Sequence, residues 1–331
     1  MADLTTTVPG VQSLLTLSAI PSPANGVLHL GPVPIHMYGV CIAIGVLIAV
    51  WIAERRWAAR GHDPAEIASM ALWIVGAGIV GARVYHLFTG YRWSDGGFWG
   101  TFAIWKGGLS IWGAVLGGTI AVVVLARVKH LDVLALMDAI GPSVAVAQAC
   151  GRWGNYFNQE LFGRPSTLPW AIEIDPVHRP LGYEQYSTFQ PTFLYESIWC
   201  LVVFGLIVLL ERRTRLRKGQ AFAAYLVLYP FGRFFFENMR TDQASVILGL
   251  RLNAWVSLLV MAFGAGWFVW LGRKGSSYSD GFPIRTLPAN WRRANGTGTS
   301  VPQTEGGAMS QSGAEAEAEA EAEPEADEAS A

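Results

Sequence analysis

The densest group of polar side chains within an apolar part of the chain is GRWGNYFNQELFGR, residues 151–164, which follows the apolar run IGPSVAVAQAC. Arg152 opens this group, and Asn155, Asn158 and Glu160 follow it. Amide and carboxylate side chains hydrogen-bond hydroxyl groups, amide N–H groups also donate to phosphate, and a planar guanidinium pairs with two phosphate oxygens without losing its charge. The stretch therefore favours a site for a phosphate or polyhydroxyl group, although a structural connection between a helix and a loop would have a similar composition.

A second group of charges lies inside the apolar run YPFGRFFFENMRTD. Steps of four, four and three residues place its polar members along one face of a helix: Tyr229, Arg233, Glu237 and Arg240. Ionisable side chains are costly inside a membrane span, so they usually face the protein interior or a water-filled cavity. Either Arg233 and Glu237 form an internal pair beside an interfacial Arg240, or Glu237 orients Arg233 toward an anion. The pattern favours the second arrangement.

Two residues elsewhere in the chain have less specific surroundings. Tyr38 begins an apolar run in IHMYG, where it is either an ordinary aromatic residue of the membrane interface or a hydroxyl that reaches the same site. Asp138 precedes Arg152 by fourteen residues, close to four helical turns, so the two share a helix face at opposite depths. Asp138 is therefore either a packing residue at the other end of the helix or a supporting residue of the site.

Apolar segments that are long enough to cross a bilayer must position these side chains. The chain of 331 residues is 52% hydrophobic and only 15% charged, and a membrane-spanning helix needs about 20 mainly apolar residues. The composition predicts an all-α polytopic membrane protein with about seven transmembrane helices. The predicted spans are 34–53, 66–88, 108–126, 133–151, 193–211, 219–238 and 253–271.

The distribution of cations predicts the orientation of these spans. Fifteen of the 24 Lys and Arg residues follow spans one, three, five and seven, which places those loops in the cytoplasm and the N-terminus outside. Residues 1–33 are then an external segment and residues 34–272 the membrane-spanning body, with an external cap at about 155–191. Arg152 and Arg233 both lie toward the outer surface, where a phospholipid head group entering from the side would supply a phosphate.

The remaining residues, 273–331, have a different composition. The sequence SGAEAEAEAEAEPEADEASA near the end repeats like charges at helical spacing, which opposes helix formation. We expect a disordered cytoplasmic tail that is acidic at its end. The three cysteines lie in separate apolar runs, and neither they nor the six histidines have the spacing of a metal site, so no metal is predicted.

The motifs resemble those of bacterial prolipoprotein diacylglyceryl transferases. GRWGNYFNQELFGR is similar to the family signature, a Gly-Arg-x-Gly-Asn-x-x-Asn-x-Glu run that ends in Gly-Arg. The resemblance covers about residues 18–275 in order, through GPVPIHMYG, GARVYHLF, WKGGLSIWG, QPTFLYE and YPFGRFFFENMRTD.

The resemblance implies a seven-span enzyme of the bacterial cell membrane. It would transfer the diacylglyceryl group of phosphatidylglycerol to the thiol of the lipobox cysteine in a prolipoprotein signal peptide, and release glycerol phosphate. The implied partners are this lipid, the signal peptide and the bilayer, with no nucleic acid and no cofactor. Arg152 would bind the phospholipid and Arg233 would be required for transfer. Other implied site residues are Tyr38, Asn155, Glu160 and Glu237, with Gly154, Asn158, Gly163, Tyr229, Arg240 and Asp138 in support.

One position departs from the family pattern. Many members have a histidine, often proposed as the general base, where this chain has Trp112. Either His36 or His86 is the base, or none is needed, because neighbouring cations lower the pKa of a cysteine thiol from about 8.5 to about 3.5–7.5.

Two functions from other classes remain as alternatives. A transporter would favour internal repeats or spans broken at the midplane of the membrane, and the sequence shows no internal repeat. A non-catalytic lipid-binding membrane protein would share the composition and the arginines, and Trp112 keeps that alternative open.

Overall fold

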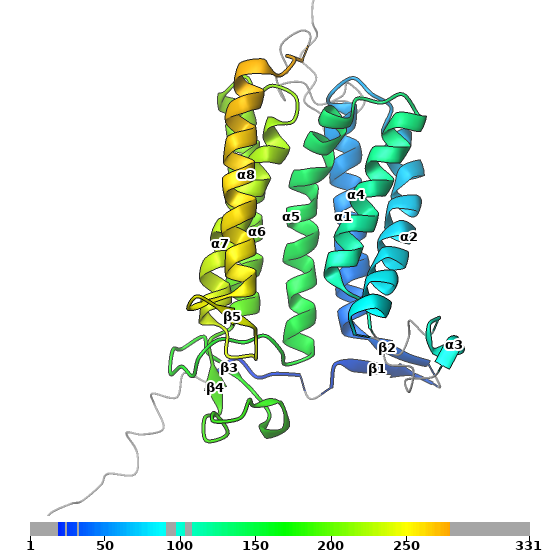
Figure 1. Ribbon diagram of the computed structural model, residues 1–331. Helices are drawn as coiled ribbons and strands as arrows, with labels where there is room; N and C mark the ends of the chain where they lie inside the picture. The colour runs from blue at the N-terminus through cyan, green and yellow to red at the C-terminus, as the bar shows by residue number, and fades with distance from the viewer. Residues whose placement is uncertain (1–18, 24, 32, 91–96, 103–107, 279–331) are drawn as a thin grey trace, which may run out of the picture. The chain divides into compact units, whose positions relative to one another are not determined.

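The computed structural model describes residues 19–23, 25–31, 33–90, 97–102 and 108–278, and the described part of the chain is mainly helical (Figure 1). Its seven long helices fall on the seven predicted spans. They are α1 (Met37–Ala58), α2 (Pro64–Thr89), α4 (Ile111–Val128), α5 (Val133–Phe157), α6 (Thr192–Arg213), α7 (Gln220–Met239) and α8 (Leu252–Lys274). A four-residue helix, α3 (Gly97–Gly100), precedes α4.

Short strands form three antiparallel pairs in the described residues, one before α1 and two between later long helices. β1 (Val27–Leu30) pairs with β2 (Val33–His36), β3 (Ile172–Glu173) with β4 (Thr188–Phe189), and β5 (Val246–Ile247) with β6 (Leu250–Arg251). The 3₁₀-helix η4 (Pro176–His178) lies between β3 and β4. Residues 158–191, which include β3 and β4, are called the cap, and the end of the bundle where they lie is the cap end (bottom of Figure 1).

Six of the long helices are long and apolar enough to cross a membrane, which confirms the predicted polytopic architecture. Helix α7 is not among the six, although its 20 residues match the length of a span. Arg233 and Glu237 make it more polar than its neighbours. Because α6 ends at one end of the bundle and α8 begins at the other, α7 must run the length of the bundle to connect them (Figure 1).

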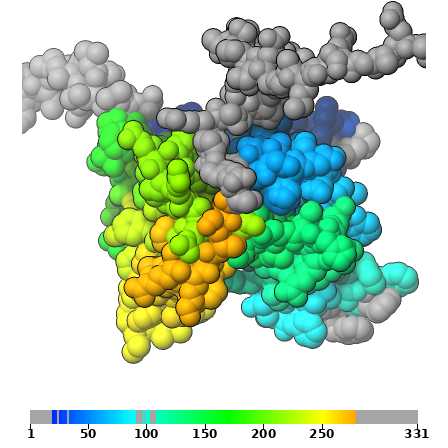
Figure 2. All heavy atoms as spheres, turned by 90° about the horizontal axis from the view of Figure 1, so that it is seen from above, coloured from blue at the N-terminus to red at the C-terminus, as the bar shows by residue number. Residues whose placement is uncertain are grey.

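Helix α5 is the central element of the bundle. It packs on α1, α6 and α7, while α2 packs on α4 and α8 packs on α7. Small residues such as Ala135, Ala139, Ala145 and Ala149 let the neighbouring backbones come close, and 56% of the apolar window of α5 is buried, against at most 33% in the other candidate spans. Seen along the bundle, α8 and α4 lie on opposite sides of the molecule (Figure 2).

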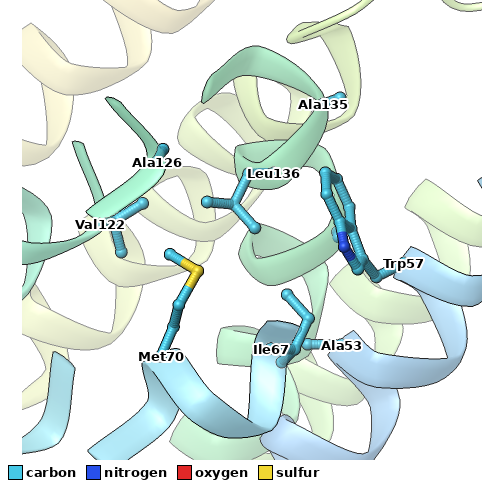
Figure 3. Close-up of a cluster of buried hydrophobic side chains, with 9 residues drawn as sticks. Ala53, Trp57, Ile67, Met70, Val122, Ala126, Ala135 and Leu136 are labelled. Atoms are coloured by element: carbon cyan, nitrogen blue, oxygen red, sulfur yellow. The ribbon is translucent and has the colours of Figure 1, made fainter. Parts of the chain in front are cut away.

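A hydrophobic core fills the end of the bundle opposite the cap. Trp57 of α1, Met70 of α2 and Leu136 of α5 are fully buried and face one another (Figure 3). The indole N–H of Trp57 donates to Oε2 of Glu66 at 2.7 Å, so the one polar atom of this ring is satisfied. We call this end the Arg56 end, after the arginine described next.

Buried charges at the Arg56 end join four helices. Arg56 of α1 donates to both carboxylate oxygens of Glu211 of α6, at 2.9 and 2.8 Å. Asp138 of α5 accepts the backbone N–H groups of Gly219 and Phe222, at 2.7 and 2.8 Å, and thereby caps the first turn of α7. Asp138 therefore lies about 20 Å along α5 from Arg152, away from the other predicted site residues.

The first residues of the predicted tail also contact the bundle. Helix α8 ends at Lys274, and the backbone carbonyl of Ser276 then accepts the N–H of Lys218 at 3.2 Å. The hydroxyl of Tyr278 donates to Oδ2 of Asp138 at 2.7 Å. Burial beside this carboxylate raises the pKa of Tyr278, so the phenol stays protonated as a donor. The rest of the predicted tail, residues 279–331, lies outside the described residues.

Helices α2 and α4 approach each other through glycines. A side-chain carbon added to Gly81 would collide with the carbonyl oxygen of Gly113, and one added to Gly117 would collide with that of Ala77. Gly113 and Gly117 therefore allow the backbone of α4 to pack closely against α2.

Gly81→Ala is expected to destabilise the protein by about 1–3 kcal/mol, because the added methyl group forces two backbones apart. The matched control is Gly76→Ala in the same helix, since a carbon added to Gly76 meets no atom within 4 Å. The midpoint of thermal unfolding in detergent measures both. Equal midpoints for the two variants would contradict the close packing of α2 and α4.

A chain that ends at residue 278 is expected to unfold at nearly the same temperature as the full chain, whereas a chain that ends at residue 274 unfolds at a lower temperature. The shorter chain leaves Asp138 without the hydroxyl of Tyr278, and a buried carboxylate that loses a donor destabilises the fold. Tyr278→Phe in the full chain removes the hydrogen bond but keeps the ring, so its unfolding temperature shows how much of the loss is due to the hydrogen bond alone.

Candidate active site

Three helices bring charged side chains together toward the cap end of the bundle. Arg152 of α5 contacts Oε2 of Glu196 of α6 through its Nη2 atom at 2.7 Å. Arg233 of α7 donates from Nη1 to the same oxygen at 3.1 Å. The Nη2 atom of Arg152 also donates to the hydroxyl of Tyr229 at 3.4 Å. The two arginines predicted from the sequence are therefore neighbours, and one carboxylate oxygen joins them.

Glu196 was not among the predicted site residues, although it lies in the quoted motif QPTFLYE. A carboxylate in the second turn of an otherwise apolar span is itself a signal of a functional position, because an ionised group there needs a partner. Its side chain is 4% exposed, and the two arginines meet that need. The contact of Glu196 with an arginine could be predicted from the sequence only by someone who already knew that α5, α6 and α7 are adjacent.

Two residues that follow Glu196 in α6 hydrogen-bond to the neighbouring helices and so fix the position of Glu196. The hydroxyl of Ser197 donates to the carbonyl oxygen of Ala149 at 3.0 Å, which ties α6 to α5. The indole N–H of Trp199 donates to the carbonyl oxygen of Leu228 at 3.0 Å, which ties α6 to α7. Glu196 is thus held between the two helices that carry its arginines.

Glu237 is the second carboxylate that binds Arg233. Its side chain is fully buried, and its Oε2 atom lies 2.6 Å from Nη2 of Arg233, so the predicted contact between these residues is confirmed. Arg240 reaches the same oxygen at 3.3 Å, and Nε of Arg251 donates to Oε1 at 2.9 Å. Since Arg251 ends β6 and precedes α8, Glu237 links the end of α7 to the start of α8.

Asp242 completes this group of charges. It accepts Nε of Arg240 at 2.7 Å and Nη2 of Arg251 at 2.9 Å. Burial by itself raises the pKa of Asp242, but the hydrogen bonds and charges of the two arginines outweigh it and hold the pKa below its usual value. We define the charge cluster as four arginines and three acids with a formal net charge of +1: Arg152, Arg233, Arg240, Arg251, Glu196, Glu237 and Asp242.

A second polar group lies at the end of α5. The ring of Tyr38 packs directly on Gly154, where a side-chain carbon would collide with it. The amide of Asn155 donates to Oε1 of Glu160 at 2.8 Å, and the amide of Asn158 reaches the same oxygen at 3.4 Å. Four of the predicted polar residues are thus close to the C-terminal end of α5, one to two turns beyond Arg152.

Gly163 connects the cap to the charge cluster. It forms an isolated antiparallel bridge with Arg240, and its N–H donates to the carbonyl oxygen of Gln190 at 2.9 Å. A side-chain carbon at this position would lie 2.9 Å from the Cβ atom of Gln190, so only glycine allows this close approach.

The guanidinium groups can bind an anion from outside the protein. The side chains of Arg152 and Arg233 are each 17% exposed. Within the described part of the chain, Nε and Nη1 of Arg152 have no hydrogen-bond partner, and no buried side-chain nitrogen or oxygen is unpaired. These N–H groups are therefore accessible, and they are suited to a phosphate.

Trp112 and the two predicted candidates for a general base, His36 and His86, do not belong to the three helices that form this contact. Trp112 is in the first turn of α4 and is 48% exposed. His36 precedes α1 and is exposed, and His86 lies in the last turn of α2 beside Gly108. Among the described residues, no hydrogen bond joins either histidine to Arg152, Arg233 or Glu196.

Comparison with known proteins identifies the family. Residues 25–270 match the family model described as prolipoprotein diacylglyceryl transferase. Phosphatidylglycerol–prolipoprotein diacylglyceryl transferase 1 of Streptomyces coelicolor is 47% identical over 263 residues, 78% of this chain and 76% of that protein. The enzyme of the same name from Frankia alni is 48% identical over 249 residues, covering 74% and 66%. That of Paenarthrobacter aurescens is 42% identical over 289 residues, covering 84% and 91%. The chain therefore belongs to the prolipoprotein diacylglyceryl transferase family.

Proposed function

We propose that this protein is a transferase that moves the diacylglyceryl group of phosphatidylglycerol to the thiol of the lipobox cysteine in a prolipoprotein signal peptide. The observation that carries the proposal is the contact of Arg152 and Arg233, from two helices, on one side-chain oxygen toward the cap end of the bundle. Such a pair suits the phosphate of a lipid that enters from the membrane. The related enzymes of Streptomyces coelicolor and Frankia alni are named for the same substrates, which supports the proposal.

The reaction breaks one bond and forms one. The cysteine sulfur, as thiolate, attacks the glyceryl carbon that carries the phosphate ester, so that a C–S bond forms and the C–O bond breaks. The bonding electrons leave with the oxygen of glycerol phosphate, and the thiol proton goes to solvent. Arg152 and Arg233 stabilise the charge that develops on the departing phosphate, and their field lowers the pKa of the thiol. Glu237 holds Arg233 in place.

The polar group at the end of α5 suits the alcohol part of the lipid head group. Asn155 and Glu160 share a hydrogen bond, and the hydroxyl of Tyr38 belongs to the same end of the bundle. Amide, carboxylate and phenol groups bind the hydroxyls of a glycerol. Asn158, Gly154 and Gly163 shape this region, and Tyr229 and Arg240 support the two arginines.

The proposed location is the bacterial cell membrane, with the cap end and the N-terminus outside and the C-terminus in the cytoplasm. The basic loops after α1, α4 and α6 and the basic last turn of α8 all lie at the Arg56 end, which supports this orientation. No cofactor enters the proposal, because the phosphate ester of the lipid supplies the leaving group. Residues 1–33, 34–272 and 273–331 are then the external segment, the transferase body and the cytoplasmic tail.

Purified protein, mixed with phosphatidylglycerol vesicles and a lipobox peptide, is expected to yield a peptide whose mass has increased by one diacylglyceryl group. Arg152→Lys is expected to lower this rate by at least about 100-fold, because a point charge does not reproduce a forked phosphate contact. Arg55→Lys, at the exposed far end of α1, is the control and keeps the parent rate. A transporter or a lipid-binding protein without activity would give no adduct.

Trp112→Phe is expected to keep most of the activity, because Trp112 lies outside the charge cluster. Trp112→His is expected to raise the rate by less than about tenfold, whereas a working general base contributes about 10²–10⁴-fold. Initial rates of adduct formation between pH 6 and pH 9 measure both variants. A gain of several hundredfold for Trp112→His would show that the parent lacks a base that its reaction needs.

A further inference from the structure

Glu196 occupies the position between the two arginines that a phosphate oxygen would need. Its Oε2 atom accepts Nη2 of Arg152 and Nη1 of Arg233, at 2.7 and 3.1 Å. Two guanidinium groups from different helices repel each other, and the shared oxygen holds them at the spacing that fits one anionic oxygen. A phosphate that binds these two groups must therefore compete with the carboxylate.

Glu196 is also the least firmly held acid of the charge cluster. Glu237 uses both oxygens, toward Arg233, Arg240 and Arg251, and Asp242 likewise uses both. In the described part of the chain, Glu196 has contacts through Oε2 alone. A rotation of its side chain can release the arginines without breaking any other hydrogen bond.

We propose that Glu196 is a built-in competitor for the phosphate site, which limits the arginine pair to singly charged phosphate diesters and weakens its hold on doubly charged phosphate monoesters. The inference rests on the proposed function for its substrates. The charge cluster has a net charge of +1, which one phosphodiester neutralises. Phosphatidylglycerol carries one negative charge, whereas a phosphate monoester carries about 1.5 to 2 at pH 7, since its second pKa is about 6.

The consequence for catalysis is faster release of product. Glycerol phosphate is a monoester, so its second charge arises only after transfer. That charge lies near the carboxylate of Glu196 in a partly buried site, where like charges repel strongly. Glu196 is a positioning residue in this scheme. It binds both guanidinium groups and holds them in place before the lipid binds, and it binds them again when the product leaves.

The groups that face Glu196 come from its own helix and from the two helices packed against it. Arg152 faces it from α5, and Arg233 faces it from α7, with Tyr229 beside Arg152. Cys200 lies one turn further along α6 and is buried. Glycerol phosphate, as a phosphate monoester, gains its second negative charge between pH 5.5 and pH 8, since its second pKa is about 6.

The test compares Glu196→Gln with the parent and with Glu196→Asp. Glu196→Gln keeps the shape and removes the charge. It is expected to strengthen inhibition by glycerol phosphate at pH 8 by at least about tenfold, and the gain is expected to shrink at pH 5.5, where the monoester carries one charge. Glu196→Asp keeps the charge and the parent ratio between the two pH values. Glu173→Gln, an exposed acid of the cap, is the control.

A direct binding measurement makes the inference testable whether or not transfer is detected. Full-length protein in nanodiscs is titrated with two lipids. Phosphatidic acid is a phosphate monoester, and phosphatidylglycerol is a phosphate diester. Glu196→Gln is expected to favour phosphatidic acid by at least about tenfold more than the parent does at pH 8. An unchanged ratio, or an equal change for both lipids, overturns the inference. Thermal midpoints of all variants separate misfolding from altered binding, and Glu196→Asp supplies the second variant.

Discussion

The ion pairs of Arg233 with Glu196 and Glu237 are the interaction on which the cap end of the bundle depends. A guanidinium group inside an apolar bundle is tolerated only when opposite charge lies within hydrogen-bond distance. Arg233 meets this condition with two carboxylates, at 3.1 and 2.6 Å, from α6 and from its own helix. Because Glu196 also binds Arg152 of α5, three helices share one electrostatic contact.

The same contact explains why the site is both stable and available to a ligand. Glu237 has no exposed surface and is fully engaged, whereas Arg152 and Arg233 are each 17% exposed. Within the charge cluster, Glu237 therefore holds the helices together, whereas Arg152 and Arg233 are partly exposed to a ligand. Glu196 stands between these parts and is the residue through which ligand binding and helix packing affect each other.

Periodicity and composition were sufficient to predict the helices, because six of them are apolar runs long enough to cross a membrane and the seventh, α7, places its charges along one helix face. They also predicted the contact between Arg233 and Glu237, which are one helical turn apart. The partners of Arg152 and the role of Arg251 could not be predicted in this way. Glu196 contacts arginines that lie 37 or more positions away, and only the packing of α5, α6 and α7 creates these contacts. The contact of Arg251 with Glu237 forms only where β6 meets the end of α7. Asp138 shows the converse, since a shared helix face with Arg152 did not place it near the site.

Helix α7 is held at both ends by charges from other parts of the chain. Asp138 of α5 caps its first turn, and Arg251, which precedes α8, binds Glu237 in its last turn. It is also the one long helix too polar to qualify as a span by itself. During synthesis, α7 would therefore enter the bilayer poorly until α5 and α6 are in place, and its final charge partner arrives only when the chain reaches residue 251. The charge cluster thus assembles late, with the insertion of the last helix.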